Sequence, residues 1–411
     1  MKLLELKQEI EKYQYFEDMN IIDVALASIV ATRMKLGDPV WLVIIGPSSG
    51  GKSQILRPLA LTDPKFLHRV DDLTENTFLS GMKLSAGKDA SLLNRIGKQG
   101  MIVVSDLTVL FSKAKEARAT ILSQFRMIYD GEMVKSTGTS DKPISWEGYL
   151  GIIAGSTPSI YGHFEEVADM GERFIYYRMK DYDAEKATRL SMSRGMYGRE
   201  LDKKLAELYA KYIQHTVMEA PKEIVLNETI KDRVLSIAVF AERVRTTAHV
   251  DFRERTIDRI PTPAMPMRVA LQLTSIAKGL FVMRNGDLSE NDMRIIDWCG
   301  YSLANEEKRA CLKVLAKIPF GVGMTTHDIA DVIGLSTPIT NHILQNLTSV
   351  GVVRRQGGAD SLLWNIKHES DWHIVRRVER IDTIEEIKTR NVSIEENEEL
   401  DEIGKEILAQ F

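Results

Sequence analysis

The feature that most constrains the fold is an apolar run that ends in a glycine-rich loop. Residues Val40–Ile45 read VWLVII, and residues Gly46–Ser53 read GPSSGGKS. An uninterrupted apolar run is typical of a strand buried on both faces of a parallel sheet. The segment QILRPLALT after Ser53 has the pattern of a helix. A strand, a tight loop and a helix in this order predict an α/β fold in which parallel strands alternate with helices.

The loop matches the pattern G-x-x-x-x-G-K-[ST] in full. Its glycines allow backbone N–H groups to turn inward around a phosphate, and the following helix adds the positive end of its dipole. We expect Lys52 to reach the β- and γ-phosphates of ATP and the Ser53 hydroxyl to ligate Mg²⁺. The predicted ATP-binding residues are Gly46, Pro47, Ser48, Ser49, Gly50, Gly51, Lys52 and Ser53.

A second buried strand supplies an acid about 50 residues further on. Residues Gly100–Asp106 read GMIVVSD, and Asp106 is the only carboxylate at the end of this strand. Asp106 is either the acid on the Mg²⁺ side or, if Ser105 occupies that position, the acid that orients the attacking water. The sequence does not decide between these two roles of Asp106. The simplest alternative is that Asp106 only caps the next helix.

Further candidate residues follow in the chain. The apolar strand LGIIAGSTP (Leu150–Pro158) ends in Ser156 and Thr157, either of which could bond the attacking water or the γ-phosphate. Arg173 precedes a short strand, where an arginine can project into the γ-phosphate of a neighbouring subunit. Arg268 stands at the start of a helix and is a candidate second sensor of the nucleotide. The alternatives are a hydroxyl turn before Pro158 and two surface arginines.

The pattern along the chain predicts five regions. Residues 1–36 read as helical, the core contains further strands near Leu67 and Ile175, and most of residues 181–301 reads as helical. The expected regions are an N-terminal helical segment (1–35), a P-loop ATPase core (36–180), a helical lid (181–304), a small C-terminal domain (305–370) and a charged helical tail (371–411).

A polar, glycine-rich stretch inside the core, GEMVKSTGTSDKPISWEG, predicts a hairpin. Lys135 and Lys142 flank its tip. Lysines on a protruding hairpin suit contacts with the DNA backbone, which need charge but carry no sequence information. In a ring these lysines would point into the pore; otherwise the hairpin is simply solvated.

Residues Met324–Arg355 carry the pattern of a helix-turn-helix. Gly334 turns the chain, Pro338 opens a second helix, and VVRRQGGADSLLWNI reads as a β-hairpin wing. This pattern resembles a winged-helix domain, a fold that binds DNA or proteins. The candidate DNA contacts are Thr337, Thr340, Asn341, Arg354 and Arg355.

Composition excludes several classes of protein. The 411 residues carry a formal net charge of −4, which argues against a uniformly basic nucleic-acid coat. The two cysteines are too few for a disulfide framework. No apolar run approaches the roughly 20 residues that span a bilayer, and the charged N-terminus lacks the apolar core of a signal peptide. We therefore expect a cytoplasmic protein with no membrane partner.

The order of these motifs resembles the AAA+ superfamily over roughly residues 35–300. The segments YDGEMVKSTG, WEGYLGIIAGSTP, GERF and PMRVALQLTSIAKGL resemble the hairpin, sensor-1, arginine-finger and sensor-2 segments of one clade. That clade contains minichromosome-maintenance helicases and related ATPases of phages and mobile elements. The sequence departs from the family in lacking an Asp-Glu pair at Ser105–Asp106, so the resemblance does not identify the catalytic base.

The resemblance implies an ATP-hydrolysing DNA translocase or helicase that acts in replication as a ring, expected to be a hexamer. Its partners would be single-stranded or forked DNA, further copies of itself and other replication proteins. One alternative is an AAA+ helicase loader or replication initiator that binds DNA without unwinding it. An ATP-dependent transcription regulator and a nucleotide switch that does not hydrolyse ATP are two others.

Overall fold

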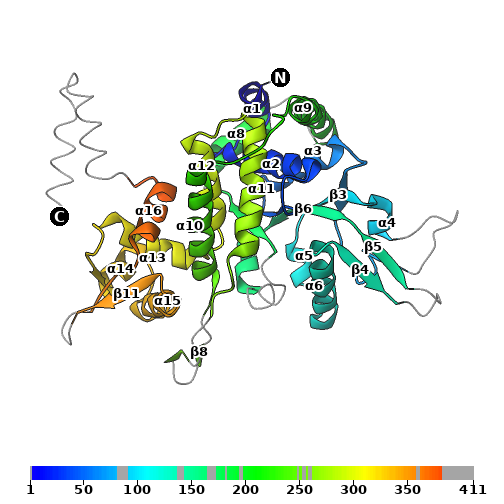
Figure 1. Ribbon diagram of the computed structural model, residues 1–411. Coiled ribbons are helices and arrows are strands. Elements are labelled where there is room, and N and C mark those ends of the chain that lie inside the picture. The colour runs from blue at the N-terminus through cyan, green and yellow to red at the C-terminus, as the bar shows by residue number, and fades with distance from the viewer. Residues whose placement is uncertain are drawn as a thin grey trace, which may run out of the picture.

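The chain folds around a five-stranded sheet whose strands all run parallel (Figure 1). The computed structural model describes residues 2–80, 91–136, 143–163, 173–180, 183–193, 198–247, 250–251, 256–257, 262–357 and 362–381. The strands are β1 (Trp41–Ile45), β2 (Leu67–Val70), β3 (Gln99–Val104), β6 (Tyr149–Ser156) and β7 (Ile175–Arg178). Their order is β2-β3-β6-β1-β7. The predicted α/β core with flanking helices is therefore confirmed.

One face of the sheet is covered by α2 (Asn20–Met34) and α3 (Lys52–Thr62). Two glycines of β6 lie four residues apart and therefore point to the same face. A Cβ atom on Gly151 would lie 2.8 Å from Oγ1 of Thr32 in α2, and one on Gly155 would lie 3.0 Å from Cδ1 of Leu56 in α3. The absence of side chains at these two positions lets both helices approach the strand closely.

The opposite face is covered by α6 (Lys115–Tyr129), as Figure 1 shows. Trp41 of β1 meets the rings of Phe125 and Tyr129 edge-on, with centroids 5.5 and 5.2 Å apart. Its indole N–H donates to the carbonyl of Leu150 at 2.8 Å, so the fully buried tryptophan has a polar partner. All five residues of β1 are buried, as the uninterrupted apolar run predicts.

The N-terminal segment is not the continuous helix that its pattern predicts. It forms α1 (Leu3–Glu11) and α2, and the residues between them are not helical. Tyr177 of β7 donates a hydrogen bond to Asp18 of this connection at 3.0 Å. Lys180 forms an ion pair with the same carboxylate at 3.2 Å. Bonds to the carboxyl end of β7 therefore hold the connection across the sheet edge that carries the glycine-rich loop.

The elements between the strands include the predicted hairpin. Its strands, β4 (Glu132–Lys135) and β5 (Ile144–Glu147), pair antiparallel and extend beside α6 (Figure 1). The tip, residues 137–142, lies outside the described residues. The remaining short elements are α4 (Leu92–Ile96), α5 (Thr108–Phe111) and the 3-10 helix η1 (Pro158–His163).

The predicted helical region contains α8 (Ala184–Ser193), α9 (Gly198–Met218), α10 (Glu228–Arg245), α11 (Met267–Met283) and α12 (Glu290–Tyr301). It also contains a short antiparallel pair, β8 (Val250–Asp251) with β9 (Thr256–Ile257), which the helical pattern does not predict. Helix α11 lies against α2, and a Cβ atom on Gly279 would lie 2.3 Å from the Ala27 carbonyl oxygen. The region is thus packed onto the core.

The C-terminal part has the helix-turn-helix and the β-hairpin that the sequence predicts, and one short strand that it does not. It contains α13 (Glu306–Lys317), β10 (Met324–Thr325), α14 (Thr326–Ile333), α15 (Thr337–Ser349), β11 (Val353–Gln356), β12 (Leu363–Ile366) and α16 (Glu369–Glu379). The strands form an antiparallel sheet in the order β10-β12-β11. Gly334 ends α14 at a φ of 71°. Within the described residues, no helix has both the length and the hydropathy needed to cross a bilayer.

Candidate functional site

The loop Gly46–Ser53 leaves the carboxyl end of β1 and enters α3. Its start is tied to the neighbouring strand, because the Gly46 N–H donates to the Ser156 carbonyl at 3.1 Å. The loop then closes a turn from the Gly50 N–H to the Pro47 carbonyl at 3.1 Å. Gly51 has a φ of 89°, a conformation that glycine adopts without the strain of a side chain. The strand, loop and helix expected from the sequence are all present.

Lys52 is the first residue of α3 and turns back over the loop. Its Nζ atom donates to the carbonyl oxygens of Gly46 and Pro47 at 2.8 and 2.7 Å. Burial lowers the pKa of this ammonium, and the charge of Asp106 opposes the shift. Lys52 and Asp106 therefore interact electrostatically although they are 54 residues apart in the chain.

Close packing around Gly155 joins the loop helix to the acidic strand end. A Cβ atom on Gly155 would lie 2.7 Å from the carbonyl oxygen of Ser105 and 3.7 Å from Cβ of Lys52. The Leu107 N–H also donates to the Gly155 carbonyl at 2.7 Å. The ends of β3 and β6 and the start of α3 thus meet at one glycine.

The acidic strand end carries two side chains with different partners. Asp106 is half-buried, and its Oδ1 accepts a hydrogen bond from the Thr108 N–H at 2.9 Å. Ser105 instead donates from Oγ to Oδ1 of Asp71 at 2.6 Å. Asp106 remains the only carboxylate at the end of β3, but β2 brings Asp71 to the same edge of the sheet. Asp71 was not predicted from the sequence, because the pairing of β2 with β3 cannot be read from either strand alone.

The hydroxyl groups at the carboxyl end of β6 form a connected cluster. Ser156 is fully buried, and its Oγ lies 3.2 Å from Oγ1 of Thr108. Thr157 is half-buried, and its N–H donates to the same Thr108 oxygen at 3.2 Å. Of the two candidates that the sequence left open, Thr157 has the more accessible side chain. Thr108 was not predicted; it links this cluster to Asp106.

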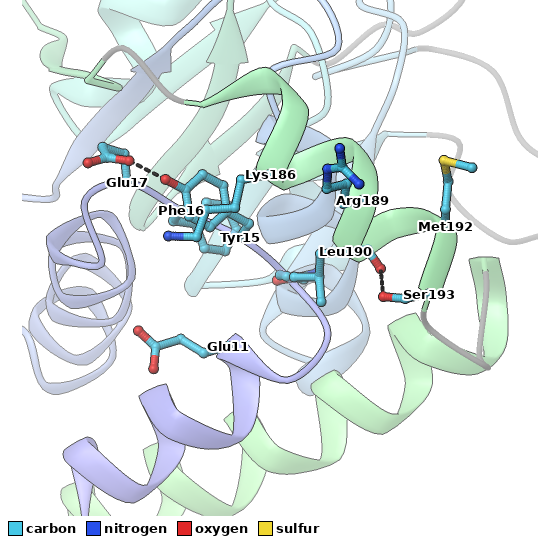
Figure 2. Close-up of a pocket in the computed structure, with 10 residues that line it drawn as sticks. Glu11, Tyr15, Phe16, Glu17, Lys186, Arg189, Leu190, Met192 and Ser193 are labelled. Atoms are coloured by element: carbon cyan, nitrogen blue, oxygen red, sulfur yellow. Dashed lines mark hydrogen bonds between the residues drawn. The ribbon is translucent and has the colours of Figure 1, made fainter.

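A cavity of about 940 Å³ opens between the connection after α1 and helix α8. Figure 2 shows Tyr15 and Phe16 from the connection, with Lys186 and Leu190 of α8 among the other side chains that line it. The Lys186 ammonium lies 4.8 Å from the centre of the Tyr15 ring. The cavity is large enough for a ligand of nucleotide size.

The same connection contacts the glycine-rich loop. The side-chain amide of Gln14 donates to the Gln54 carbonyl in the first turn of α3 at 2.8 Å. A Cβ atom on Gly51 would lie 3.5 Å from a ring carbon of Phe16. A narrower cavity is lined by Phe16, Gly50 and Met179. Tyr15 and Phe16 therefore lie between the loop and the larger cavity. The continuous helix expected from the sequence did not predict this position.

Arg173 and Arg268 lie at the other edge of the sheet, beyond the amino ends of the strands. The side-chain amide of Gln272 in α11 joins this edge, since it accepts from the Trp41 N–H at 2.8 Å and donates to the Arg173 carbonyl at 2.9 Å. Arg173 is only 4% exposed, and its guanidinium bonds both carboxylate oxygens of Asp130 at 3.0 and 2.8 Å. Burial lowers the pKa of Arg173, Asp130 opposes the shift, and the charge of exposed Arg268 adds to it.

The expectation that Lys135 projects toward DNA is not supported by its contacts. Its ammonium donates to the Glu75 carbonyl at 2.9 Å, to Oδ1 of Asn76 at 2.8 Å and to the Leu79 carbonyl at 3.1 Å. These bonds tie the hairpin to the loop after β2 and explain the position of this lysine. Lys142 lies outside the described residues.

The C-terminal candidates differ in exposure. Thr337 and Arg355 are exposed, and Asn341 and Arg354 are half-buried. Arg354 donates from Nε to Oδ1 of Asn365 at 2.7 Å. Thr340 was predicted on the outer face, and this is wrong, because its side chain is completely buried.

The physical reason for the burial of Thr340 is its helical spacing. Ile343, Leu344 and Leu347 follow it at three, four and seven residues and are buried on the same side of α15.

Ser53 and Asp106 are two residues that could meet a bound Mg²⁺. Both are half-buried oxygen-bearing side chains, and Mg²⁺ prefers hard oxygen ligands completed by water and substrate phosphates. Within the described residues, no group of three or more His, Cys, Asp or Glu side chains could form a metal site of its own. These side chains fit a metal that arrives with a nucleotide.

Comparisons with protein-family models and with curated proteins give no match for this chain.

Proposed function

We propose that this chain is an ATP-hydrolysing AAA+ protein that assembles as a ring and moves DNA. The observation that carries the proposal is the meeting of three groups at the carboxyl edge of the sheet. Lys52, Asp106 and Thr157 follow three different strands. The charge of Asp106 acts on Lys52, and Thr108 is hydrogen-bonded to both Asp106 and Thr157. A phosphate-binding loop with an acid and a hydroxyl at this edge has the parts needed for phosphoryl transfer to water.

The strand order supports the AAA+ reading. Strand β6 lies between β1, which carries the loop, and β3, which carries the acid. A hydroxyl at the end of β6 is therefore between the residues that bind phosphate and the residue that acts on water. In this proposal sensor 1 stands at that position, and Thr157 is the residue that we assign to it.

Each residue has a role in this proposal. Backbone N–H groups of the loop and the Lys52 ammonium bind the phosphates, and Asp106 orients the attacking water or holds the metal side. Ser53 would ligate Mg²⁺, which when bound would neutralise charge on the β- and γ-phosphates. Tyr15 and Phe16 would receive the base in the cavity against α8, where aromatic faces can stack on it.

The positions of the two arginines favour action between subunits. Parallel strands of five residues separate the two sheet edges by roughly 16 Å. Arg173 and Arg268 therefore act on the phosphates of a neighbouring copy, not on those of their own chain. Exposed apolar side chains lie within three residues of Arg268 in the sequence, with Met265 77%, Met267 65% and Leu271 42% exposed. In such an interface the amino ends of the strands in one copy face the carboxyl ends of the strands in the next copy. This contact is head-to-tail, and it closes into a ring when the rotation between successive copies is suitable.

The C-terminal helices and three-stranded sheet support a winged-helix domain. Thr337 at the start of α15 and Arg355 on β11 are exposed and can reach a DNA backbone. In this proposal the domain, together with the hairpin, contacts single-stranded or forked DNA during replication. Salt-sensitive binding that does not depend on base sequence is the expected behaviour.

One observation favours a second function. Lys135 is bound by three acceptors of its own chain, which removes one of the two lysines expected in a pore. A helicase loader or replication initiator needs ATP and DNA binding but no force-bearing hairpin. This alternative therefore shares the nucleotide site and differs only in strand separation.

The first experiment tests the nucleotide site. Lys52→Ala should lower ATP turnover by about 100-fold or more, because the loop loses the charge that faces the phosphates. Lys65→Ala is the matched control, since Lys65 is exposed just after α3. Turnover is measured by phosphate release on the full chain. Equal turnover in the wild type and Lys52→Ala would exclude this site.

A second measurement separates the two functions. The wild type is incubated with forked DNA and ATP, and strand displacement is followed while particles are imaged for rings. Displacement that requires Lys52 supports the translocase. Turnover and DNA binding without displacement support the loader or initiator.

A further inference from the structure

The carboxyl ends of β2 and β3 lie side by side and bring Asp71 to the site. The two strands are parallel, and Val70 pairs with Val104 at the last register position. The next residue of each strand is Asp71 and Ser105, respectively. Their side chains meet there, with the Ser105 hydroxyl donating to Oδ1 of Asp71 at 2.6 Å.

Asp71 is held as an ionised and accessible carboxylate. Arg69 donates from Nε to its Oδ1 at 2.9 Å and lies 2.9 Å from its Oδ2 through Nη2. Burial opposes ionisation, but the hydrogen bonds from Ser105 and Arg69 outweigh it and lower the pKa of Asp71. The side chain is 57% exposed, so water reaches it. The adjacent Asp72 forms a different pair, with Lys113 at 2.7 Å.

The hydrogen bond to Asp71 fixes the direction in which the Ser105 hydroxyl donates. Its only proton is directed to Asp71, so its remaining lone pairs are free to accept hydrogen bonds. A neutral hydroxyl alone is a poor substitute for a carboxylate beside a divalent cation. A hydroxyl backed by a carboxylate supplies both an acceptor and a nearby negative charge.

We infer that Asp71 is a positioning residue that supplies, through Ser105, the metal-side negative charge that the end of β3 lacks. This rests on the proposed nucleotide function. The sequence left two roles open for Asp106. This inference places Ser105 and Asp71 on the side of Mg²⁺ and Asp106 on the side of the attacking water. Mg²⁺ keeps several water ligands when bound. The carboxylate of Asp71, which lies behind Ser105, would therefore act on the metal through those waters.

One contact of Asp106 and one contact of its partner Thr108 agree with this division. Its Oδ1 accepts from the Thr108 N–H, and the Thr108 hydroxyl accepts from the Thr157 N–H. Asp106 is thus connected to the hydroxyl cluster after β6, which faces the γ-phosphate in the proposed site. Asp71 is on the other side of β3 and has no part in that cluster.

The test measures the Mg²⁺ requirement of nucleotide binding. A fluorescent ATP analogue is titrated into the full chain in EDTA and in increasing MgCl₂. Asp71→Asn should raise the half-saturating Mg²⁺ concentration about 10- to 100-fold, the range lost when an outer-sphere partner of a metal is removed. Its affinity for nucleotide in EDTA should equal that of the wild type. Asp72→Asn should match the wild type in both conditions.

A rescue distinguishes a charge at the metal from a merely local contact. Ser105→Asp restores a carboxylate on β3 itself, so adding it to Asp71→Asn should return the Mg²⁺ requirement toward that of the wild type. Ser105→Ala removes the same hydrogen bond without touching Asp71 and should also raise the requirement. It serves as the second variant if Asp71→Asn lowers stability.

The outcomes separate the two claims. An unchanged Mg²⁺ requirement in Asp71→Asn, or an equal loss of affinity with and without Mg²⁺, overturns the role of Asp71 while leaving the nucleotide site intact. Failure of the double variant to recover overturns it as well. If the wild type binds no nucleotide, the proposed function fails and this inference fails with it.

Discussion

Lys308 shows how a single buried side chain joins two parts of this molecule. It lies in the first turn of α13 and is 4% exposed. Its ammonium donates to the carbonyls of Val244 and Thr246, at the carboxyl end of α10, at 2.9 and 2.7 Å. The last carbonyls of a helix have no partner within it and carry partial negative charge. Lys308 therefore caps α10 from the C-terminal part of the chain.

This position predicts a pH dependence of stability. Burial lowers the pKa of Lys308 to about 7, with Glu307 opposing the shift. Between pH 7 and 10 the unfolded chain keeps a proton that the folded chain releases. The free energy of unfolding should therefore rise with pH, by at most about 1.4 kcal/mol per unit from this group. Urea midpoints of the wild type and Lys308→Met should diverge over this range, whereas Lys313→Met should run parallel to the wild type.

Parallel curves for Lys308→Met as well would mean that the buried ammonium stays charged. Its two carbonyl acceptors would then outweigh its burial.

At the scale of elements, the sequence predicts where the strands and helices lie better than it predicts which elements pair or pack against one another. The apolar run before Gly46 and the residue pattern of the loop are contiguous, so β1, the loop and α3 could be predicted. Asp71 could not, because its role depends on the pairing of β2 with β3. Lys135 was misjudged for a similar reason, since its acceptors come from the loop after β2. Thr340 was predictable, because its spacing from Ile343, Leu344 and Leu347 already indicates the buried face.

Tyr15 and Phe16 were missed because the helical pattern of α1 and α2 conceals the break between them. The segment YQYFED between the two helices has no glycine or proline to mark a turn. What fixes the break is distant in sequence, since Tyr177 and Lys180 bind Asp18.

The crossing of α3 over β6 predicts the effect of one added methyl group. Gly155→Ala would place a Cβ atom 2.7 Å from the Ser105 carbonyl oxygen and 3.0 Å from Leu56. Overpacking of this kind costs about 1–3 kcal/mol, so the strand end or α3 must shift. Affinity for nucleotide should fall about tenfold or more, measured by titration of labelled nucleotide. Gly162→Ala is the control, because a Cβ atom there meets nothing within 4 Å. Wild-type affinity in Gly155→Ala would show that the site tolerates a wider spacing.

At the scale of the whole molecule, the two edges of the sheet have complementary chemistry. The carboxyl edge carries the loop, the acids and the hydroxyls, and the amino edge carries Arg173, Arg268 and exposed methionines. In the proposed function neither edge is a complete site alone, because the arginines of one copy cannot reach across the strands to its own loop. Arg173 is held by Asp130 within its own chain, so its approach to a neighbouring phosphate competes with this ion pair.

Mixing two inactive variants tests whether neighbouring copies share a site. Arg173→Ala should bind ATP but lose hydrolysis, since an arginine supplied by a neighbour is worth roughly 10³–10⁵ in rate in other P-loop enzymes. Lys52→Ala keeps Arg173 but cannot use its own loop. A mixture should recover part of the turnover, because some interfaces then combine an intact loop with an intact arginine. Asp130→Asn is the matched control: it weakens the ion pair of Arg173 but keeps the guanidinium, so turnover should persist. If Asp130→Asn fails as Arg173→Ala does and mixing restores nothing, Arg173 only stabilises its own chain.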